Sequence, residues 1–229
     1  MKNVAFIFAR GGSKGLPNKN ILNFCGKPLI SYAISSALNS DLIDECYVST
    51  DSLEIANISS GFGAKIIIRP RELAEDHSPE WLAWQHAIKY VQKNFGDFDK
   101  FISLPTTSPL RIDEDITNSI EKLTDDCDFV VTFTDTNRSP WFNMVKLDEN
   151  SKISPLITGE TFFRRQDTPL SYDLTTVAYV SKPNFILENN SIWDGEVVGQ
   201  KIPLVRAIDI DTKHDFEIAE FLYQKRLQK

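Results

Sequence analysis

The chain has 229 residues, and its 25 lysines and arginines against 32 aspartates and glutamates give a formal net charge of −7. Apolar residues make up 41% and charged residues 25%, values typical of a globular domain and not of a disordered chain or a coiled coil. The acidic balance disfavours binding to a nucleic-acid polymer, and no segment approaches the ~20 consecutive apolar residues that cross a bilayer. We therefore expect a soluble, cytoplasmic protein without nucleic-acid or membrane partners. The three cysteines lack metal-ligand spacing and are expected to be buried thiols: Cys25, Cys46 and Cys127.

The first half of the chain alternates between short apolar runs and segments of helical periodicity. Strands are expected at 4–9, 45–49, 65–68, 101–104 and 128–133, and helices at 28–38, 53–62, 81–91 and 113–123. The run at 4–9 is apolar throughout, which favours a strand buried on both faces at the centre of a parallel sheet. This alternation predicts right-handed crossovers and a Rossmann-like three-layer α/β/α fold with a mainly parallel sheet.

After Thr134 the pattern changes to short β-like pieces at 142–147 and 174–180. We interpret about 135–165 as a small β-rich extension, and Trp141 and Phe142 in its polar setting as anchors of a subunit contact. A strand is expected at 202–210 and an amphipathic helix at 216–227, so that 1–229 forms a single domain.

A glycine-rich, basic loop follows the first strand: Arg10-Gly11-Gly12-Ser13-Lys14-Gly15-Leu16-Pro17-Asn18-Lys19-Asn20. Its spacing fits neither the P-loop nor the dinucleotide fingerprint. The glycines allow backbone N–H groups to approach phosphate oxygens, while Arg10, Lys14 and Lys19 neutralise several charges. The loop therefore favours a bound triphosphate, although an exposed basic turn is the plainer alternative.

Further motifs follow in order along the chain. They are Ser49-Thr50-Asp51, Arg69-Pro70 with Glu72-Leu73-Ala74 and Asp76, the LPTTSPLR stretch at 104–111, Arg165-Gln166 with Pro169 and Tyr172, and Asp209-Ile210-Asp211-Thr212. Together with the basic loop they resemble the acylneuraminate cytidylyltransferases, or CMP-sialic acid synthetases, which are related to the CMP-Kdo synthetases. The resemblance spans nearly the whole chain.

The resemblance implies a nucleotidyltransferase that moves CMP from CTP to the anomeric hydroxyl of a 2-keto-3-deoxy sugar acid and releases pyrophosphate. The implied nucleotide-binding residues are Ala9, Arg10, Gly11, Gly12, Lys14, Lys19, Asn20 and Arg69. The implied catalytic residues are Arg10, Lys14, Lys19 and Asp211. Fixed cations suit this chemistry, because charge builds up on the leaving pyrophosphate. The family is similarly dimeric, with the extension of one subunit reaching the site of the other, so a homodimer is expected.

Asp209 and Asp211 stand two apart in a predicted strand, so that both carboxylates project from one face and can share a hard cation. The alternatives are solvated acids at a strand end, or Asp211 capping the last helix. The resemblance favours Mg²⁺, or Mn²⁺, held by both aspartates. Asp113 and Asp115 have the same spacing but open a predicted helix, where acids favour the dipole, so we interpret them as structural.

On the sugar side, Arg165 matches the family arginine that pairs with the acceptor carboxylate, a role that suits the guanidinium fork. Arg164 is its main rival. Gln166 and Tyr172 are expected to line the same pocket as Arg165, and Tyr179 is a further residue that the resemblance implies in substrate binding.

Two departures affect the acceptor. Pro105 replaces the glutamine that the family has before P-T-S-P-L-R, and 175–179 read TTVAY where the family has N-G-A-I-Y. The acceptor therefore stays open among sialic, pseudaminic and legionaminic acids, Kdo and 8-amino-Kdo. The other readings are a non-catalytic sugar-nucleotide-binding protein and a Rossmann oxidoreductase. The second is disfavoured, because no tyrosine has a lysine four residues later.

Overall fold

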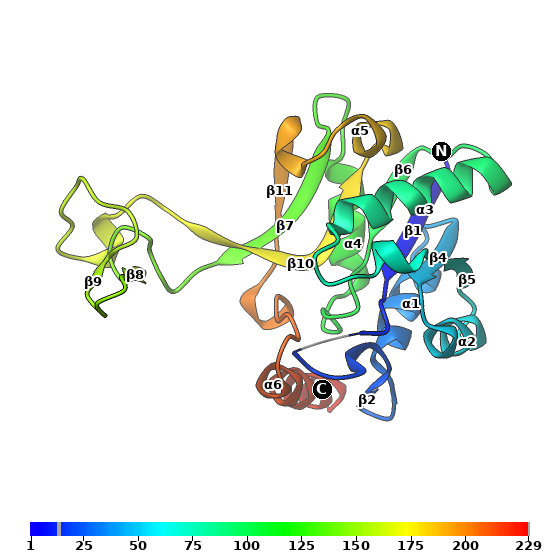
Figure 1. Ribbon diagram of the computed structural model, residues 1–229, viewed down its shortest axis with the longest axis horizontal. Coiled ribbons are helices and arrows are strands. Elements are labelled where there is room, and N and C mark those ends of the chain that lie inside the picture. The colour runs from blue at the N-terminus through cyan, green and yellow to red at the C-terminus, as the bar shows by residue number, and fades with distance from the viewer. Residues whose placement is uncertain (13–14, 229) are drawn as a thin grey trace.

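The computed structural model describes residues 1–12 and 15–228, and one sheet of seven strands forms its centre. The strands are β1 (Asn3–Phe8), β4 (Glu45–Thr50), β5 (Lys65–Ile68), β6 (Lys100–Ser103), β7 (Phe129–Asp135), β10 (Tyr172–Ser181) and β11 (Val197–Lys201). They lie in the order β11-β7-β10-β6-β1-β4-β5 (Figure 1). Only β10 runs antiparallel to its neighbours β6 and β7. The sheet is therefore mainly parallel, which confirms the expected fold class.

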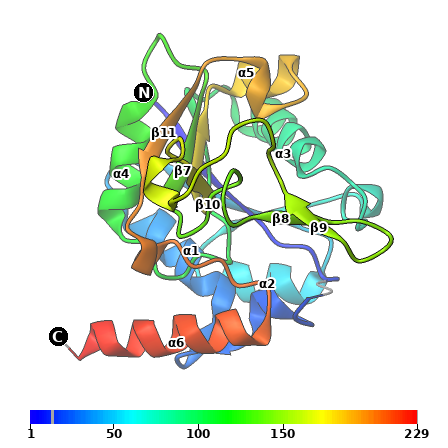
Figure 2. The ribbon, with the colours of Figure 1, turned by 90° about the vertical axis from the view of Figure 1, so that its left-hand side faces the viewer.

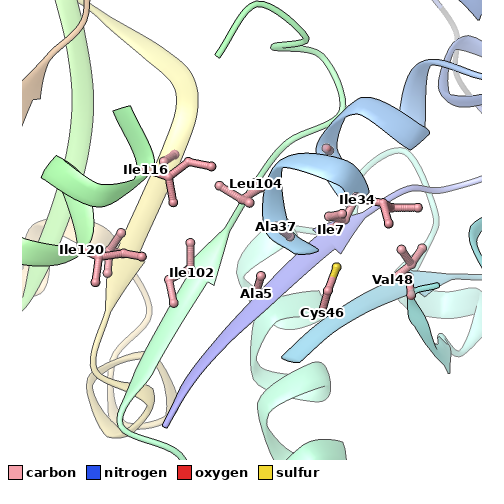
Figure 3. Close-up of a cluster of buried hydrophobic side chains, with 14 of the residues drawn as sticks. Ala5, Ile7, Ile34, Ala37, Cys46, Val48, Ile102, Leu104, Ile116 and Ile120 are labelled. Carbon is pink, nitrogen blue, oxygen red and sulfur yellow. The ribbon is translucent and has the colours of Figure 1, made fainter. Parts of the chain in front are cut away.

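Helices cover both faces of this sheet, as Figure 2 shows for α4 on one side and α3 on the other. The helices are α1 (Leu29–Asn39), α2 (Leu53–Gly61), α3 (Glu80–Phe95), α4 (Asp113–Lys122), α5 (Pro183–Glu188) and α6 (Lys213–Leu227). Because successive strand residues point to opposite faces, Ala5 and Ile7 pack with α1, α2 and α4, while Val4 and Phe6 pack with α3 and α5. Figure 3 shows the first of these two cores.

A third, smaller core joins α6 to the start of the chain. It contains Phe24, Leu29, Leu110, Ile210 and Ala219, which come from the hairpin β2 (Asn23–Phe24) and β3 (Lys27–Pro28), α1, the loop after β6, and the final segment. All five side chains are at most 3% exposed. This packing brings the loop before α6 to the carboxyl end of β1, although the two are some 200 residues apart in sequence.

An arm projects from the body of the molecule (Figure 1). The outer halves of β7 and β10 pair there, with Tyr172 opposite Asp135, and residues 136–171 lie beyond them. The hairpin β8 (Val145–Leu147) and β9 (Ile153–Pro155) lies at the far end. The predicted β-rich extension is therefore present. Its role as a subunit contact stays a prediction.

The predicted strand at 202–210 is wrong. The last strand, β11, ends at Lys201, and Ile202 makes a final ladder bond to the Phe133 carbonyl at 2.7 Å. Pro203 follows and has no N–H to donate, so the sheet stops there. Asp209 and Asp211 consequently lie in an irregular loop and not in a strand.

The structure also bears on the predicted burial of the cysteines and on the length of the helices. Cys46 and Cys127 are buried as expected, whereas Cys25 is partly exposed. In the described part of the chain, the longest helices are too short or too polar to span a bilayer.

Candidate active site

The loops that follow β1, β4, β5 and β6 meet at one edge of the sheet, because the carboxyl ends of parallel strands lie on the same side. Ala9 is fully buried there, and its backbone N–H donates to the Ser49 carbonyl at 3.0 Å. The backbone N–H of Gly11 donates to Asp51 Oδ1 at 3.0 Å. These bonds fix the start of the glycine-rich loop against the end of β4.

The close approach in this loop occurs at Gly15. A Cβ atom there would lie 2.6 Å from the backbone oxygen of Asp211, whereas a Cβ on Gly12 would meet open space. Only a residue without a side chain fits against the segment before α6 at this point. The predicted triphosphate cation Lys14 lies outside the described residues.

Asn20 ties the glycine-rich loop to the loop after β6. Its Nδ2 donates to the Arg10 carbonyl at 3.1 Å, and its Oδ1 accepts from the Thr106 hydroxyl at 2.6 Å. The side chain is 8% exposed, and both ends of its amide are engaged. Asn20 therefore holds the two loops in place, and its direct contact with a nucleotide stays a prediction.

Lys19 joins the same loop to the aspartate segment. Its Nζ donates to the Ile210 carbonyl at 2.7 Å and to Asp211 Oδ1 at 3.0 Å. The side chain of Lys19 is 13% exposed, while that of Asp211 is 72% exposed. Two groups that the sequence places 192 positions apart are thus in direct contact.

Arg10 and Arg69 bring two more cations to this edge. Arg10 Nη1 pairs with Asp76 Oδ1 at 2.7 Å, and Arg69 Nη2 donates to the Ser49 carbonyl at 3.1 Å. Arg69 is 6% exposed, and within residues 1–12 and 15–228 its Nε has no hydrogen-bond partner. Burial lowers the pKa of Arg69, an effect that the charges of Asp51 and Glu80 oppose. A buried donor without a partner is costly, so a ligand acceptor at this point would be favourable.

Two adjoining hollows open between these groups. The first, of about 270 Å³, is lined by Phe8, Arg10, Arg69, Leu73, Glu75, Asp76, Ser78 and Glu80. The second, of about 240 Å³, is lined by Phe8, Arg10, Lys19, Asn20, Glu80, Pro105, Thr106, Thr107, Thr176 and Tyr179. Phe8, Arg10 and Glu80 border both hollows. Together they offer an elongated, polar site for a ligand with two parts.

Asp209 is the better buried of the two predicted metal ligands. Burial raises the pKa of its carboxyl group, the hydroxyls of Thr107 and Thr176 lower it, and the nearby charge of Asp211 raises it. Its Oδ1 is buried and has no hydrogen-bond partner in the described part of the chain. An orphaned carboxylate oxygen beside a second carboxylate fits a hard divalent cation that takes its other ligands from phosphate and water. Within the described residues no group of three acidic, histidine or cysteine side chains gathers as a metal site.

Arg111 is a buried residue whose role the sequence motif did not reveal. It is 4% exposed and donates through Nε to the Val177 carbonyl at 3.0 Å and through Nη2 to the Pro105 carbonyl. Burial lowers its pKa, against the opposing charge of Asp115. Arg111 therefore shapes the loop after β6 from below and does not face either hollow. Asp115 is structural as predicted: its carboxylate caps the backbone N–H of Ile112 at 3.1 Å.

Glu80, the first residue of α3, also escaped the sequence analysis. An acid in a first helical turn is ordinarily explained by the dipole, and no motif singles it out. Burial raises the pKa of its carboxyl group, while the indole of Trp84 and the charge of Arg69 lower it and Asp209 raises it. The carboxyl is surrounded by protein but stays open to solvent on the side of the two hollows that it borders.

The predicted sugar-binding residues divide between two places. Tyr179 borders the second hollow, and burial raises its pKa to about 12, helped by Glu80 and Asp209. Arg165, Gln166 and Tyr172 instead line a separate hollow of about 290 Å³ on the arm. Within one chain Arg165, Gln166 and Tyr172 therefore lie together, apart from the nucleotide-side cluster, and their role in binding the sugar acid stays a prediction.

On the arm, the two neighbouring arginines face different partners. Arg164 forms two bonds of 2.8 Å with the carboxylate of Asp167. Among the residues that the structure describes, Arg165 has one hydrogen-bond partner, the Thr136 carbonyl, to which its Nη1 donates at 3.3 Å. Arg164 is thus already paired, and Arg165 remains the better candidate to bind a carboxylate.

The fold of the chain is similar to that of a solved structure. It superposes on the solved structure of CMP:2-keto-3-deoxy-manno-octonic acid synthetase complexed with CTP with a TM-score of 0.73, over 99% of this chain and 100% of that one, at 18% identity. At such low identity the likeness shows the shared fold alone.

The sequence then defines the family. The cytidylyltransferase family model matches residues 4–228, so the chain belongs to the cytidylyltransferases. It is 33% identical over 226 residues to the pseudaminic acid cytidylyltransferase of Campylobacter jejuni subsp. jejuni (strain 81-176), covering 98% of this chain and 97% of that protein. It is 34% identical over 219 residues to the CMP-N,N'-diacetyllegionaminic acid synthase of Campylobacter jejuni subsp. jejuni (strain NCTC 11168), covering 94% and 92%. The family expected from the motifs is thereby confirmed.

Proposed function

We propose that this protein transfers CMP from CTP to an ulosonic acid of the pseudaminic or legionaminic class. Two relatives that match over nearly their full length carry these names. The observation that carries the proposal is the convergence of Arg10, Lys19 and Arg69 with Asp209 and Asp211 at one edge of the sheet. A non-catalytic nucleotide-binding protein has no need of the paired carboxylates.

In the proposed reaction the anomeric hydroxyl oxygen of the acceptor forms a bond to the α-phosphorus of CTP. The bond from this phosphorus to the oxygen that bridges to the β-phosphate breaks, and pyrophosphate leaves with the electron pair while the hydroxyl proton is released. Lys19 and Arg10 stand where they can stabilise the charge that develops on the leaving group. Because Asn20 and Gly15 fix the loop beforehand, these cations need little rearrangement.

We infer that Asp209 and Asp211 hold Mg²⁺, or Mn²⁺, during turnover. The unpartnered buried oxygen of Asp209 and the exposed carboxylate of Asp211 support this assignment. A bound divalent ion would supply Lewis-acid polarisation of the phosphate oxygens. Lys19 positions Asp211 for that task, because its Nζ holds both the Asp211 carboxylate and the preceding carbonyl.

We propose a homodimer in which the arm of one subunit carries Arg165 to the site of the other. The arm supports this arrangement with large apolar side chains that are more than half exposed: Val145, Leu147, Ile153, Phe163, Leu170 and Leu174. An apolar surface of this kind marks an interaction site. The guanidinium of Arg165, which has only one weak internal partner, is then available for the acceptor carboxylate. Light scattering at micromolar concentration should give twice the mass of 26.0 kDa.

The test is pyrophosphate release from CTP and Mg²⁺ with a panel of pseudaminic, legionaminic, sialic and Kdo-type acids. We expect release with the first or second acid and none with Asp211→Asn, which should fold like the wild type. A cytoplasmic enzyme is expected, since CTP is its donor. Failure to release pyrophosphate with every acid would contradict the proposal, and preference for a Kdo-type acid would contradict the acceptor assignment.

A further inference from the structure

Arg69 and Glu80 approach the first hollow from two different elements. Arg69 follows β5 directly, and its backbone N–H continues the ladder to the Thr50 carbonyl at 2.8 Å. Glu80 begins α3. Each lowers the cost of ionising the other: Glu80 raises the pKa of Arg69, and Arg69 lowers the pKa of Glu80. The hollow is therefore lined by a guanidinium donor and by a carboxylate acceptor.

The guanidinium of Arg69 has one anchored nitrogen and one nitrogen that is buried without a partner among the described residues. Arg69 Nη2 is anchored to the Ser49 carbonyl at 3.1 Å, which sets the plane of the guanidinium. Arg69 is 6% exposed, and its buried Nε has no hydrogen-bond partner among the described residues. This unpartnered group points to a ligand with a hydrogen-bond acceptor.

The acceptor side belongs to Glu80, because the other carboxylates that line the hollow are otherwise engaged. Asp76 pairs with Arg10 at 2.7 Å, and Glu75 lies 3.2 Å from the imidazole of His77 on the outer rim. Glu80 has no salt bridge among the described residues. Glu80 is exposed, so its carboxylate can be reached by a ligand in the hollow.

We propose that Glu80 is a base-specificity residue, which accepts a hydrogen bond from the exocyclic amino group of cytosine while Arg69 donates to the ring acceptors beside it. Cytosine presents an amino donor next to ring acceptors, whereas uracil presents a carbonyl oxygen where cytosine has the amino group. A carboxylate facing that oxygen places two acceptors against each other without a donor between them. Glu80 thus selects CTP against UTP by repulsion as well as by attraction. The inference rests on the proposed function in taking CTP as the nucleotide.

Glutamine is the informative substitution. Its amide keeps one acceptor oxygen for cytosine but adds an NH₂ donor that can satisfy uracil, so Glu80→Gln removes the repulsion and nearly preserves the shape. We expect the ratio of UTP to CTP dissociation constants to fall about 10- to 100-fold, as for a lost polar discrimination of about 1–3 kcal/mol. The fall should come mainly from tighter UTP binding. Glu80→Ala should weaken CTP binding itself.

The experiment is calorimetric titration of the full chain with CTP and with UTP, in Mg²⁺ and without acceptor sugar. The matched control is Glu54→Gln, an exposed acid in the first turn of α2 that touches neither hollow. Thermal melting confirms that each variant is folded. A selectivity ratio in Glu80→Gln within twofold of the wild type overturns the inference, and so does an equal loss of both nucleotides. Unchanged binding with loss of turnover alone also overturns it, because Glu80 would then act on a proton.

These outcomes separate the two proposals. The wild-type protein could bind CTP selectively through Glu80 but turn over no ulosonic acid. That result would contradict the proposed reaction and still support the role of Glu80 in base specificity. Equal turnover with CTP and UTP in the wild type would support the transfer reaction and contradict the role of Glu80 in base specificity.

Discussion

Replacing Lys19 with methionine tests how the two ends of the chain are joined at the site. The substitution keeps the length of the side chain but removes its donors to the Ile210 carbonyl at 2.7 Å and to Asp211 Oδ1 at 3.0 Å. A hydrogen bond from a charged donor contributes about 1.5–3 kcal/mol. The ion pair adds at most about 1 kcal/mol, because Asp211 is 72% exposed and solvent screens it.

The expected loss of unfolding free energy is therefore about 2–3 kcal/mol, measured by urea denaturation. For a chain of this size that corresponds to a fall of roughly 4–12 °C in melting temperature. Turnover should fall further than stability implies, by about 10²–10³-fold, because a fixed cation beside the leaving group is lost. Lys27→Met, at an exposed position in β3, is the control and should change neither quantity. A Lys19→Met variant that loses less than 0.5 kcal/mol and keeps wild-type turnover would refute this account of the tether.

Three further predictions follow from single contacts. Gly15→Ala should lower turnover at least about 10-fold in a steady-state assay, because its Cβ would lie 2.6 Å from the Asp211 carbonyl and push the loop aside. Gly61→Ala, in open space, is its control. Arg111→Met should cost about 3–5 kcal/mol in urea denaturation, since two buried carbonyls lose a charged donor; an unchanged midpoint would contradict this role. Asp215→Asn should cost about 1 kcal/mol at pH 7, because Asp215 closes the capping box of α6 with Thr212. The Thr212 hydroxyl lowers the pKa of Asp215, so this stability is present above the ordinary value of 3.8 and is lost as pH falls through the folded-state pKa. Melting curves that stay apart at lower pH would contradict the cause.

The regular half of the fold could be predicted because its signals are local. The apolar run of β1 and the helical spacing of apolar residues in α1 predict which residues are buried. Because the carboxyl ends of parallel strands lie on one side of the sheet, the loops that follow them are then expected to lie together. The last strand was misplaced because β11 is an edge strand with Gly199, Gln200 and Lys201 in it, whereas the more apolar segment after Pro203 cannot join the ladder.

The site residues likewise divide into those with a local sequence signal and those without one. Arg10, Lys19 and Asp211 could be found from sequence because charge and motif coincide, although their direct contact depends on how α6 packs. Glu80 gave no signal, since an acid at a helix start has a sufficient local explanation. The extension at 135–165 could be predicted from the change of pattern after Thr134, but the length of the arm could not, because nothing in the sequence says how far the paired strands β7 and β10 continue.

The central claim is that this cytidylyltransferase joins CMP to a sugar acid through a phosphodiester. Phosphorus-31 NMR of CTP, Mg²⁺, enzyme and pseudaminic or legionaminic acid tests it most directly. We predict that the three CTP resonances are replaced by one phosphodiester resonance and one pyrophosphate resonance in equal molar amounts. CDP with inorganic phosphate, or CMP without a sugar phosphodiester, would show hydrolysis in place of transfer and would contradict the account.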